Sequence, residues 1–222
     1  MDLQTLAFPE LAALREQVLT VLVNVCADLP AARLALGVAA SKDSDIAATA
    51  RLRTAPTMPA MARYTGVLYE ALDIGSLPRS ARIRAADRLL ITSALFGVLA
   101  GGDSVPAYRL SAASTLPGLG RLAPFWRPQL AAAVTQLEGP VVDLRSGAYA
   151  SFAAIPDAIT VRVVTENKEG GRTVVSHFNK ATKGLLARAL VLSRAELRGV
   201  ADVARVARRA GFKVERDRKS VV

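Results

Sequence analysis

The sequence predicts a mixed α/β (α+β) fold, in which a mixed β-sheet is flanked by helices and follows a helical N-terminal part. Three observations predict this class: helical periodicity dominates the first third of the chain, strand-like runs appear later, and no low-complexity linker separates the two. The 222 residues are 51% hydrophobic, which is ample material for a core. We therefore expect a single domain over residues 1–222, mostly helical at 1–75 and sheet-containing at 76–222.

Three helices are expected before residue 53. The first covers residues 9–29, because Pro9 suits a first helical position and apolar residues recur every three or four positions after it. A short second helix ends at Gly37. Ser41 is expected to cap the third, which ends near Leu52.

The middle of the chain introduces the strands. A loop and then a helix at residues 59–72 precede a short helix capped by Ser80. Residues 88–96 are almost continuously apolar, which predicts a central strand covered on both faces. A helix at 127–137 and a short strand at 141–144 follow.

The C-terminal third is expected to begin with a β-hairpin. Residues 159–164 alternate in polarity, and a polar, glycine-containing turn joins them to a second strand at 172–178. Asn179 is expected to cap a helix at 180–192, after which a last helix and a last strand complete the domain.

The positive charge is concentrated in this last part. The whole chain has a formal net charge of +10, and residues 170–222 carry thirteen Lys and Arg against four Asp and Glu. The first 169 residues have a net charge of only +1. This asymmetry indicates an anion-binding face or a merely solvated basic surface.

Cysteine and histidine counts exclude several classes of protein. The single cysteine, Cys26, excludes an internal disulfide framework, and with the single histidine, His177, it excludes multi-Cys and multi-His metal sites. The longest apolar stretch, residues 89–102, is too short to span a bilayer, and no signal peptide is apparent. We expect a soluble, cytoplasmic protein without metal or cofactor and without membrane contact.

Three polar clusters follow apolar runs, where a scaffold can present functional groups. They lie at residues 106–110, 143–149 and 176–184. The third is the most informative, because Lys180 and Lys183 share a helix face.

These two lysines define a candidate phosphate site. Arg188 lies near their face, and the positive end of the helix adds to the charge. Gly184 in the helix interior predicts a close backbone approach, because glycine there costs about 1 kcal/mol relative to alanine. The alternative is an ordinary basic helix. A weaker candidate is a helix-hairpin-helix turn at residues 36–38, whose backbone N–H groups could bind phosphate.

Taken in order, these segments resemble the YaaA family of bacterial peroxide-stress proteins. The matching segments are Thr65–Tyr69, Ser93–Leu99, Pro106–Leu110, Phe125–Trp126, Ser146–Tyr149 and Ser176–Leu185. The resemblance implies one mixed α/β domain with a basic cleft. It implies DNA binding, with a preference for unpaired or distorted duplex, through that cleft and a helix-hairpin-helix element, and a role in limiting peroxide damage.

Carried over to this chain, the resemblance implies that Lys180, Lys183 and Arg188 line the cleft, with Arg109 and Tyr149 nearby. Family members begin with an apolar strand and a Ser-Pro-Ala-Lys-like or Pro-Pro-Ser-Glu-like segment, whereas this chain begins Met-Asp-Leu and is expected to lack them.

Two functions remain open from the sequence. The first is a non-enzymatic, sequence-tolerant DNA-binding protein of the peroxide-stress response. The alternative is an enzyme that acts on a nucleotide or nucleobase, with Arg109, Tyr149, Lys180 and His177 in one pocket. The sequence does not predict the oligomeric state.

Overall fold

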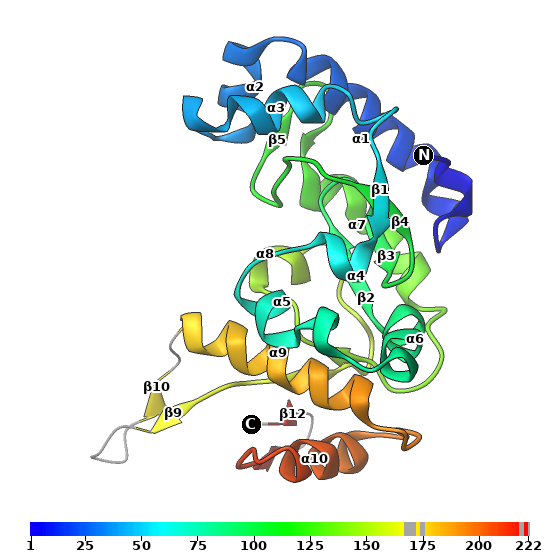
Figure 1. Cartoon of the computed structure of the whole chain (residues 1–222), viewed down its shortest axis with the longest axis vertical. Coiled ribbons are helices and arrows are strands. Elements are labelled where there is room, and N and C mark those ends of the chain that lie inside the picture. Colours follow the sequence, from blue (N-terminus) through cyan, green and yellow to red (C-terminus); the bar gives the residue numbers. More distant parts are fainter. Residues whose placement is uncertain (167–171, 174–175, 218–219, 222) are drawn as a thin grey trace. The chain divides into compact units, whose positions relative to one another are not determined.

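The computed structural model describes residues 1–166, 172–173, 176–217 and 220–221 (Figure 1). It confirms the mixed α/β class. The described chain forms two compact units that interleave along the sequence: unit 1 is Met1–Arg63, Ala86–Gln136 and Arg145–Ala154, and unit 2 is Tyr64–Ala85, Leu137–Leu144 and Ile155–Val222. The single domain expected over residues 1–222, mostly helical at 1–75 and sheet-containing at 76–222, stays a prediction.

Unit 1 begins with helices and continues with short antiparallel strand pairs. Its helical elements are η1 (Leu3–Thr5), η2 (Pro9–Leu11), α1 (Ala12–Cys26), α2 (Leu29–Leu36), η3 (Ala40–Lys42), α3 (Asp43–Thr49), α4 (Ala60–Arg63), α7 (Leu122–Val134) and α8 (Gly147–Ala150). Its strands are β1 (Thr57–Pro59), β2 (Leu90–Ser93), β3 (Gly97–Ala100), β4 (Ser104–Pro106), β5 (Thr115–Leu116) and β6 (Gly120–Arg121). They pair as β1 with β4, β2 with β3, and β5 with β6.

The core of unit 1 forms around the β2–β3 hairpin. Phe96 and Trp126 are fully buried, and the indole Nε1 of Trp126 donates a hydrogen bond to the carbonyl of Ala94 (2.9 Å). Gly97 follows with a φ of +74°, and a Cβ at that position would lie 3.0 Å from the Trp126 ring. The turn therefore needs glycine both for its backbone conformation and for space.

Unit 2 contains a four-stranded mixed sheet covered by helices. Its elements are α5 (Val67–Leu72), η4 (Ile74–Ser76), α6 (Arg79–Arg88, which ends in unit 1), β7 (Val142–Asp143), β8 (Ile159–Val161), β9 (Thr165–Glu166), β10 (Arg172–Thr173), α9 (Ser176–Leu192), α10 (Val200–Arg209), β11 (Arg216–Asp217) and β12 (Ser220–Val221). The strand order is β11-β12-β8-β7, with β8 parallel to both of its neighbours. Buried Ile159 and Val203 join the sheet to α10.

Two segments differ from the expected secondary structure. The prediction of a central strand at residues 88–96 is wrong. Among the described strands, β2 pairs with β3 alone, in a two-stranded hairpin, and Leu90 is 39% exposed. The physical reason is the turn at residues 94–96, which leads into Gly97 at the start of β3 and reverses the chain before a longer strand can form. Residues 57–59, expected in a loop, form β1.

The expected C-terminal hairpin is shorter and shifted. Its paired strands are β9 and β10, whereas β8 joins the parallel sheet, and the turn at 167–171 lies outside the described residues. The placement of His177 on a strand is wrong, and so is the Asn179 cap, because α9 already begins at Ser176. The alternation at residues 176–178 covers three residues, which is too few to distinguish a strand from the first turn of a helix.

Two helix boundaries were also misplaced. Ser41 lies within η3, and α3 begins after Lys42 without a side-chain cap. The helix expected at 59–72 is two helices, α4 and α5, because Gly66 interrupts it with a φ of +104°.

Candidate nucleic-acid interface

Lys180 and Lys183 lie one turn apart on α9, in unit 2. Lys180 is exposed to solvent, whereas Lys183 is partly buried. Burial lowers the pKa of Lys183, and the carboxylate of Asp143 at the end of β7 acts in the opposite direction. The two lysines therefore present different groups: a solvated cation and a partly desolvated one that sits near a carboxylate.

Arg188 lies about two turns after Lys180 on α9, and its guanidinium contacts the C-terminal end of α5. Its Nη1 donates to the carbonyls of Leu72 (2.9 Å) and Asp73 (2.8 Å), and its Nη2 donates to Ser76 Oγ (2.8 Å). Asp73 Oδ2 lies 3.6 Å from the same guanidinium. Arg188 thus satisfies the carbonyl of Leu72 at the end of α5 and adds a charged donor to that of Asp73, which also accepts from the backbone N–H of Ser76 (3.2 Å). Its part in phosphate binding stays a prediction.

Gly184 lets α5 pack directly against α9. A Cβ at Gly184 would lie 2.2 Å from the carbonyl oxygen of Leu68 and 2.8 Å from the Cβ of Ala71. The close backbone approach expected at Gly184 is therefore confirmed, and the approaching backbone is that of α5. This contact fixes the helix that carries Lys180 and Lys183.

Arg109 and Tyr149 lie in unit 1. Arg109 is exposed, and its backbone N–H donates to Thr49 Oγ1 (3.0 Å). Burial raises the pKa of Tyr149, which a backbone hydrogen bond at Ala112 partly opposes, and its ring packs on Phe152 with centroids 5.5 Å apart.

The five expected site residues thus divide between the units. Lys180, Lys183 and Arg188 belong to unit 2, and the other two belong to unit 1. Their meeting in one basic cleft, and the enzymatic pocket that would also need His177, stay predictions.

The expected helical hairpin is present in unit 1. Gly37 ends α2 with a φ of +64°, and α3 follows after η3. Arg33 of α2 donates through Nε (2.8 Å) and Nη2 to the carboxylate of Asp43 at the start of α3, and Lys42 lies 3.8 Å from Asp45. These cations pair with acids of the hairpin itself, and the backbone N–H groups of Gly37 and Val38 already donate to the carbonyls of Leu34 (3.3 Å) and Arg33 (3.0 Å). The expected phosphate binding by the N–H groups of this turn is therefore not supported by the described geometry.

The sequence placed Asp143 in the polar cluster at residues 143–149, at the end of a short apolar run, but did not indicate that its carboxylate acts on the pKa of Lys183. A second group, Arg84, was missed. Arg84 of α6 donates to the carbonyls of Val191 (3.0 Å) and Leu192 (3.1 Å) at the end of α9. Nothing local in the sequence distinguishes that arginine from its exposed neighbours.

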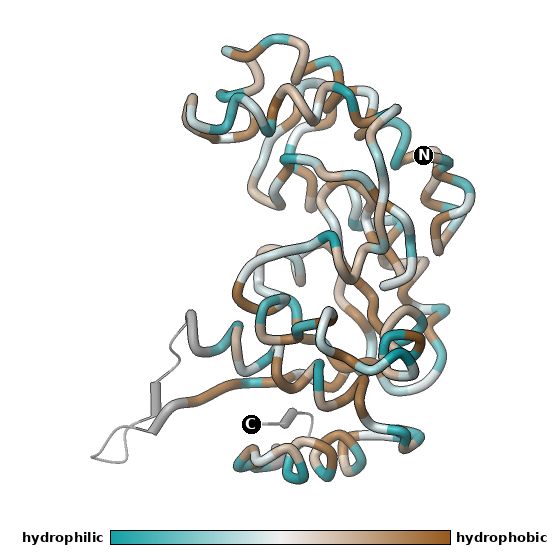
Figure 2. Tube along the Cα trace, viewed as in Figure 1, coloured by the Kyte–Doolittle hydropathy of each residue, from teal (hydrophilic) through white to brown (hydrophobic). Residues whose placement is uncertain are grey.

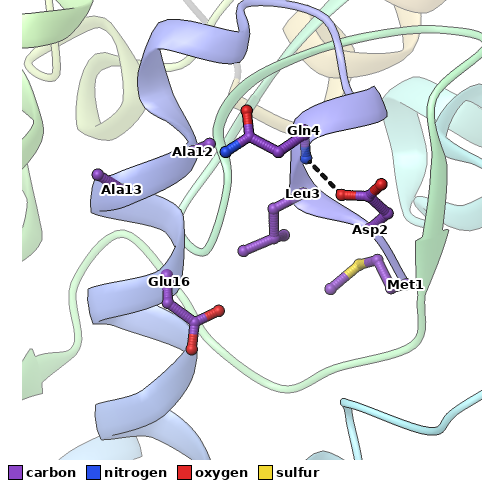
Figure 3. A pocket seen from close by; sticks show the side chains of 7 residues that line it. All are labelled: Met1, Asp2, Leu3, Gln4, Ala12, Ala13 and Glu16. Atoms are coloured by element: carbon purple, nitrogen blue, oxygen red, sulfur yellow. Dashed lines mark hydrogen bonds between the residues drawn. The ribbon is translucent and has the colours of Figure 1, made fainter.

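A pocket lies between η1 and the start of α1 (Figure 3). Its lining includes the carboxylates of Asp2 and Glu16 and no Lys or Arg side chain among the described residues. Asp2 already accepts a hydrogen bond from the backbone N–H of Gln4 (2.9 Å). Two carboxylates would repel a phosphate, so this pocket does not fit one.

In the described part of the chain, no group of three His, Cys, Asp or Glu side chains is arranged to hold a metal ion. Among the same residues, no helix combines the length and the apolar composition that crossing a membrane requires.

Comparison with known proteins identifies the family. The family described as peroxide stress protein YaaA matches residues 1–218. A UPF0246 protein from Corynebacterium efficiens is 42% identical over 221 residues, covering 97% of this chain and 87% of the relative. UPF0246 proteins from Corynebacterium glutamicum (40% identical, covering 97% of this chain and 87% of the relative) and Streptomyces coelicolor (41%, covering 95% and 83%) are similar over almost the same length.

The class that these matches define is a bacterial peroxide-stress family, and the expected resemblance is confirmed. The chain belongs to the YaaA (UPF0246) family.

Proposed function

We propose that the chain binds DNA without strong sequence preference and so protects it during peroxide stress. The family supports the stress role, because its description is that of a peroxide stress protein. The preferred substrate is a duplex that contains unpaired or distorted regions. The binding surface includes the face of α9 that carries Lys180 and Lys183.

The observation that carries this proposal is the segregation of charge. Unit 2 holds eighteen Lys and Arg against eleven Asp and Glu, a net charge of +7, whereas unit 1 has a net charge of +3. Asp73 and Arg188 pair with each other, so this pair leaves the net charge of unit 2 unchanged. The net positive charge of unit 2 creates an electrostatic field that attracts a polyanion to exposed cations such as Lys180.

The chemistry of these groups fits the phosphate backbone more than the bases. Lysine ammonium groups are point charges with three donors, and phosphate contacts position a protein on a duplex without reading its sequence. Lys183 adds a partly desolvated ammonium, which interacts more strongly with a phosphate than a solvated one does.

A binding titration tests the proposal. The intact chain is titrated against a fully paired duplex and against the same duplex with an unpaired bubble, at increasing salt concentration. We expect affinity to fall steeply with salt, because each phosphate contact releases counterions, and to be higher for the bubble. Absence of binding at low salt, or an affinity that does not change with salt, would contradict DNA binding.

The protective role has its own test. Plasmid DNA is exposed to hydrogen peroxide and ferrous ion with and without the chain. We expect fewer strand breaks when the chain is present at concentrations that saturate the DNA. Equal strand breakage at saturation would leave DNA binding in place and remove protection from the proposal.

A further inference from the structure

Helix α10 has one buried apolar face and one exposed basic end. Val203, Ala204, Val206 and Ala207 are buried, and the tube in Figure 2 shows hydrophobic and hydrophilic residues alternating along this helix. The exposed residues of its last turns and of the segment that follows are mostly basic. We call this set the α10 strip: Arg205, Arg208, Arg209 and Lys213.

Two members of the strip are already engaged inside unit 2. Arg205 pairs with Asp202, whose other carboxylate oxygen accepts from the backbone N–H of Arg198 (2.8 Å). Arg208 donates to the carbonyl of Val214 (3.1 Å). The first contact lies within α10, and the second joins its last turn to the segment that follows, so both hold arginine side chains on the helix surface.

The other two members have no such compensation. Arg209 and Lys213 are exposed, and among the described residues neither forms an ion pair or a side-chain hydrogen bond. Within the described part of the chain, two cations without an ion pair therefore lie beside two arginines whose side chains are already engaged.

We propose that the α10 strip binds the phosphate backbone of a nucleic-acid duplex, as a contact surface separate from the lysines of α9. The inference rests on the proposed DNA binding and assigns it a second set of residues. The helix is anchored through Val203 to Ile159 and its neighbours in the sheet, so the strip is positioned before any partner arrives. Preorganised cations lose little conformational entropy on binding.

A lipid surface fits the strip less well. A basic amphipathic helix binds a membrane by inserting its apolar face, and the apolar face of α10 is packed against the sheet. None of the large hydrophobic side chains that are exposed in the described chain lies on α10. Attraction to phosphate without apolar insertion is typical of nucleic-acid contacts.

The experiment measures the salt dependence of duplex affinity for three forms of the full chain. The test variant is R209Q/K213Q. The matched control is R51Q/R121Q, which removes the same charge from exposed positions in unit 1. The charge-conserving variant R209K/K213R reports any effect of side-chain shape, and the urea midpoint of each variant reports folding.

We expect R209Q/K213Q to reduce the slope of log affinity against log salt by about 1.8, because each phosphate contact contributes about 0.9. The control should change the slope by clearly less, and R209K/K213R should bind like the wild-type chain. A slope for R209Q/K213Q equal to that of the control overturns the strip and leaves the proposed function standing. A wild-type chain that does not bind the duplex overturns the function itself.

Sedimentation with phosphatidylserine-containing vesicles separates the two anionic surfaces. We expect no co-sedimentation at physiological salt. Co-sedimentation that R209Q/K213Q abolishes and R51Q/R121Q does not would assign the strip to lipid headgroups and overturn its assignment to nucleic acid.

Discussion

Two regions of the molecule use arginine in opposite ways. In unit 1 the guanidinium of Arg15 is completely buried, and its Nε donates to the carbonyl of Phe96 (3.0 Å). Its Nη2 donates to the carbonyls of Ala7 (2.7 Å) and Val98 (2.8 Å). In unit 2 the cations at the end of α10 face solvent.

The difference shows that a count of basic residues does not measure a binding surface. Arg15 contributes to the formal charge of +10, but its side chain is fully buried and not accessible to a partner. Burial lowers its pKa to about 10. Arg188 and Arg84 are similarly occupied by the ends of helices in unit 2. The cations available to a polyanion are those that remain after these internal contacts are subtracted.

The largest expected effect is the loss of the buried guanidinium. We expect Arg15→Met to lower the free energy of unfolding by about 3–5 kcal/mol, because the carbonyls of Phe96 and Val98 would stay buried without their donor. Urea denaturation measures the change. The control is Arg53→Gln, which breaks an exposed pair with Glu16 and should cost at most about 1 kcal/mol. Similar losses in the two variants would contradict the contrast between buried and exposed cations.

The second prediction concerns the thiol of Cys26, which is buried in α1. Burial raises its pKa from 9.0 to about 11, so the thiolate fraction near neutral pH falls about 100-fold. We expect iodoacetamide to alkylate the folded chain about 100-fold more slowly than the chain in urea.

The same shift has a pH signature. The unfolded thiol ionises before the folded one, so its contribution to stability is complete below pH 9 and is lost as the pH rises to about 11. Cys26→Ala should remove that contribution.

Because peroxide attacks the thiolate, Cys26 is also a poor peroxide target, and Cys26→Ala should protect plasmid DNA as well as the wild-type chain does. Rapid alkylation of the folded chain by iodoacetamide would contradict the raised pKa of Cys26.

The third prediction tests the packing that holds α9. Gly184→Ala should lower the free energy of unfolding by about 1–3 kcal/mol, since the new Cβ would collide with the backbone of Leu68, and this outweighs the better helix propensity of alanine. The matched control is Gly147→Ala in α8, where no heavy atom lies within 4 Å of the added Cβ. Urea midpoints of both variants measure the difference. A stabilised Gly184→Ala variant would show that α5 can move away without cost.

The sequence predicted local features where the signal is itself local. The ends of α2 at Gly37 and the tight contact at Gly184 were predicted because glycine has few other reasons to occupy those positions. The first helix and the strand at Val142 followed from periodicity and apolar content.

The parts that depend on distant partners were not predictable in the same way. The apolar run at 88–96 suits a central strand equally well, and only its pairing with β3 shows that it is a hairpin arm. Arg188 resembles any basic residue on a helix face, and its role depends on the end of α5, more than a hundred residues earlier. Tertiary contacts of this kind override local patterns.

Helix α9 carries one engaged cation, Arg188, and one exposed cation, Lys180, whose substitutions should have opposite effects. Arg188→Gln should lower the free energy of unfolding by about 1–2 kcal/mol, since the carbonyls of Leu72 and Asp73 lose a charged donor. It should leave the salt slope of DNA affinity unchanged in the folded protein. Lys180→Gln should do the reverse: stability should stay within about 0.5 kcal/mol, and the slope should fall by about 0.9. Urea midpoints and titrations at several salt concentrations measure both quantities in the same two proteins. If Arg188→Gln lowers the slope and Lys180→Gln does not, then the hydrogen bonds of Arg188 do not remove it from the binding surface, and the division between occupied and available cations is wrong.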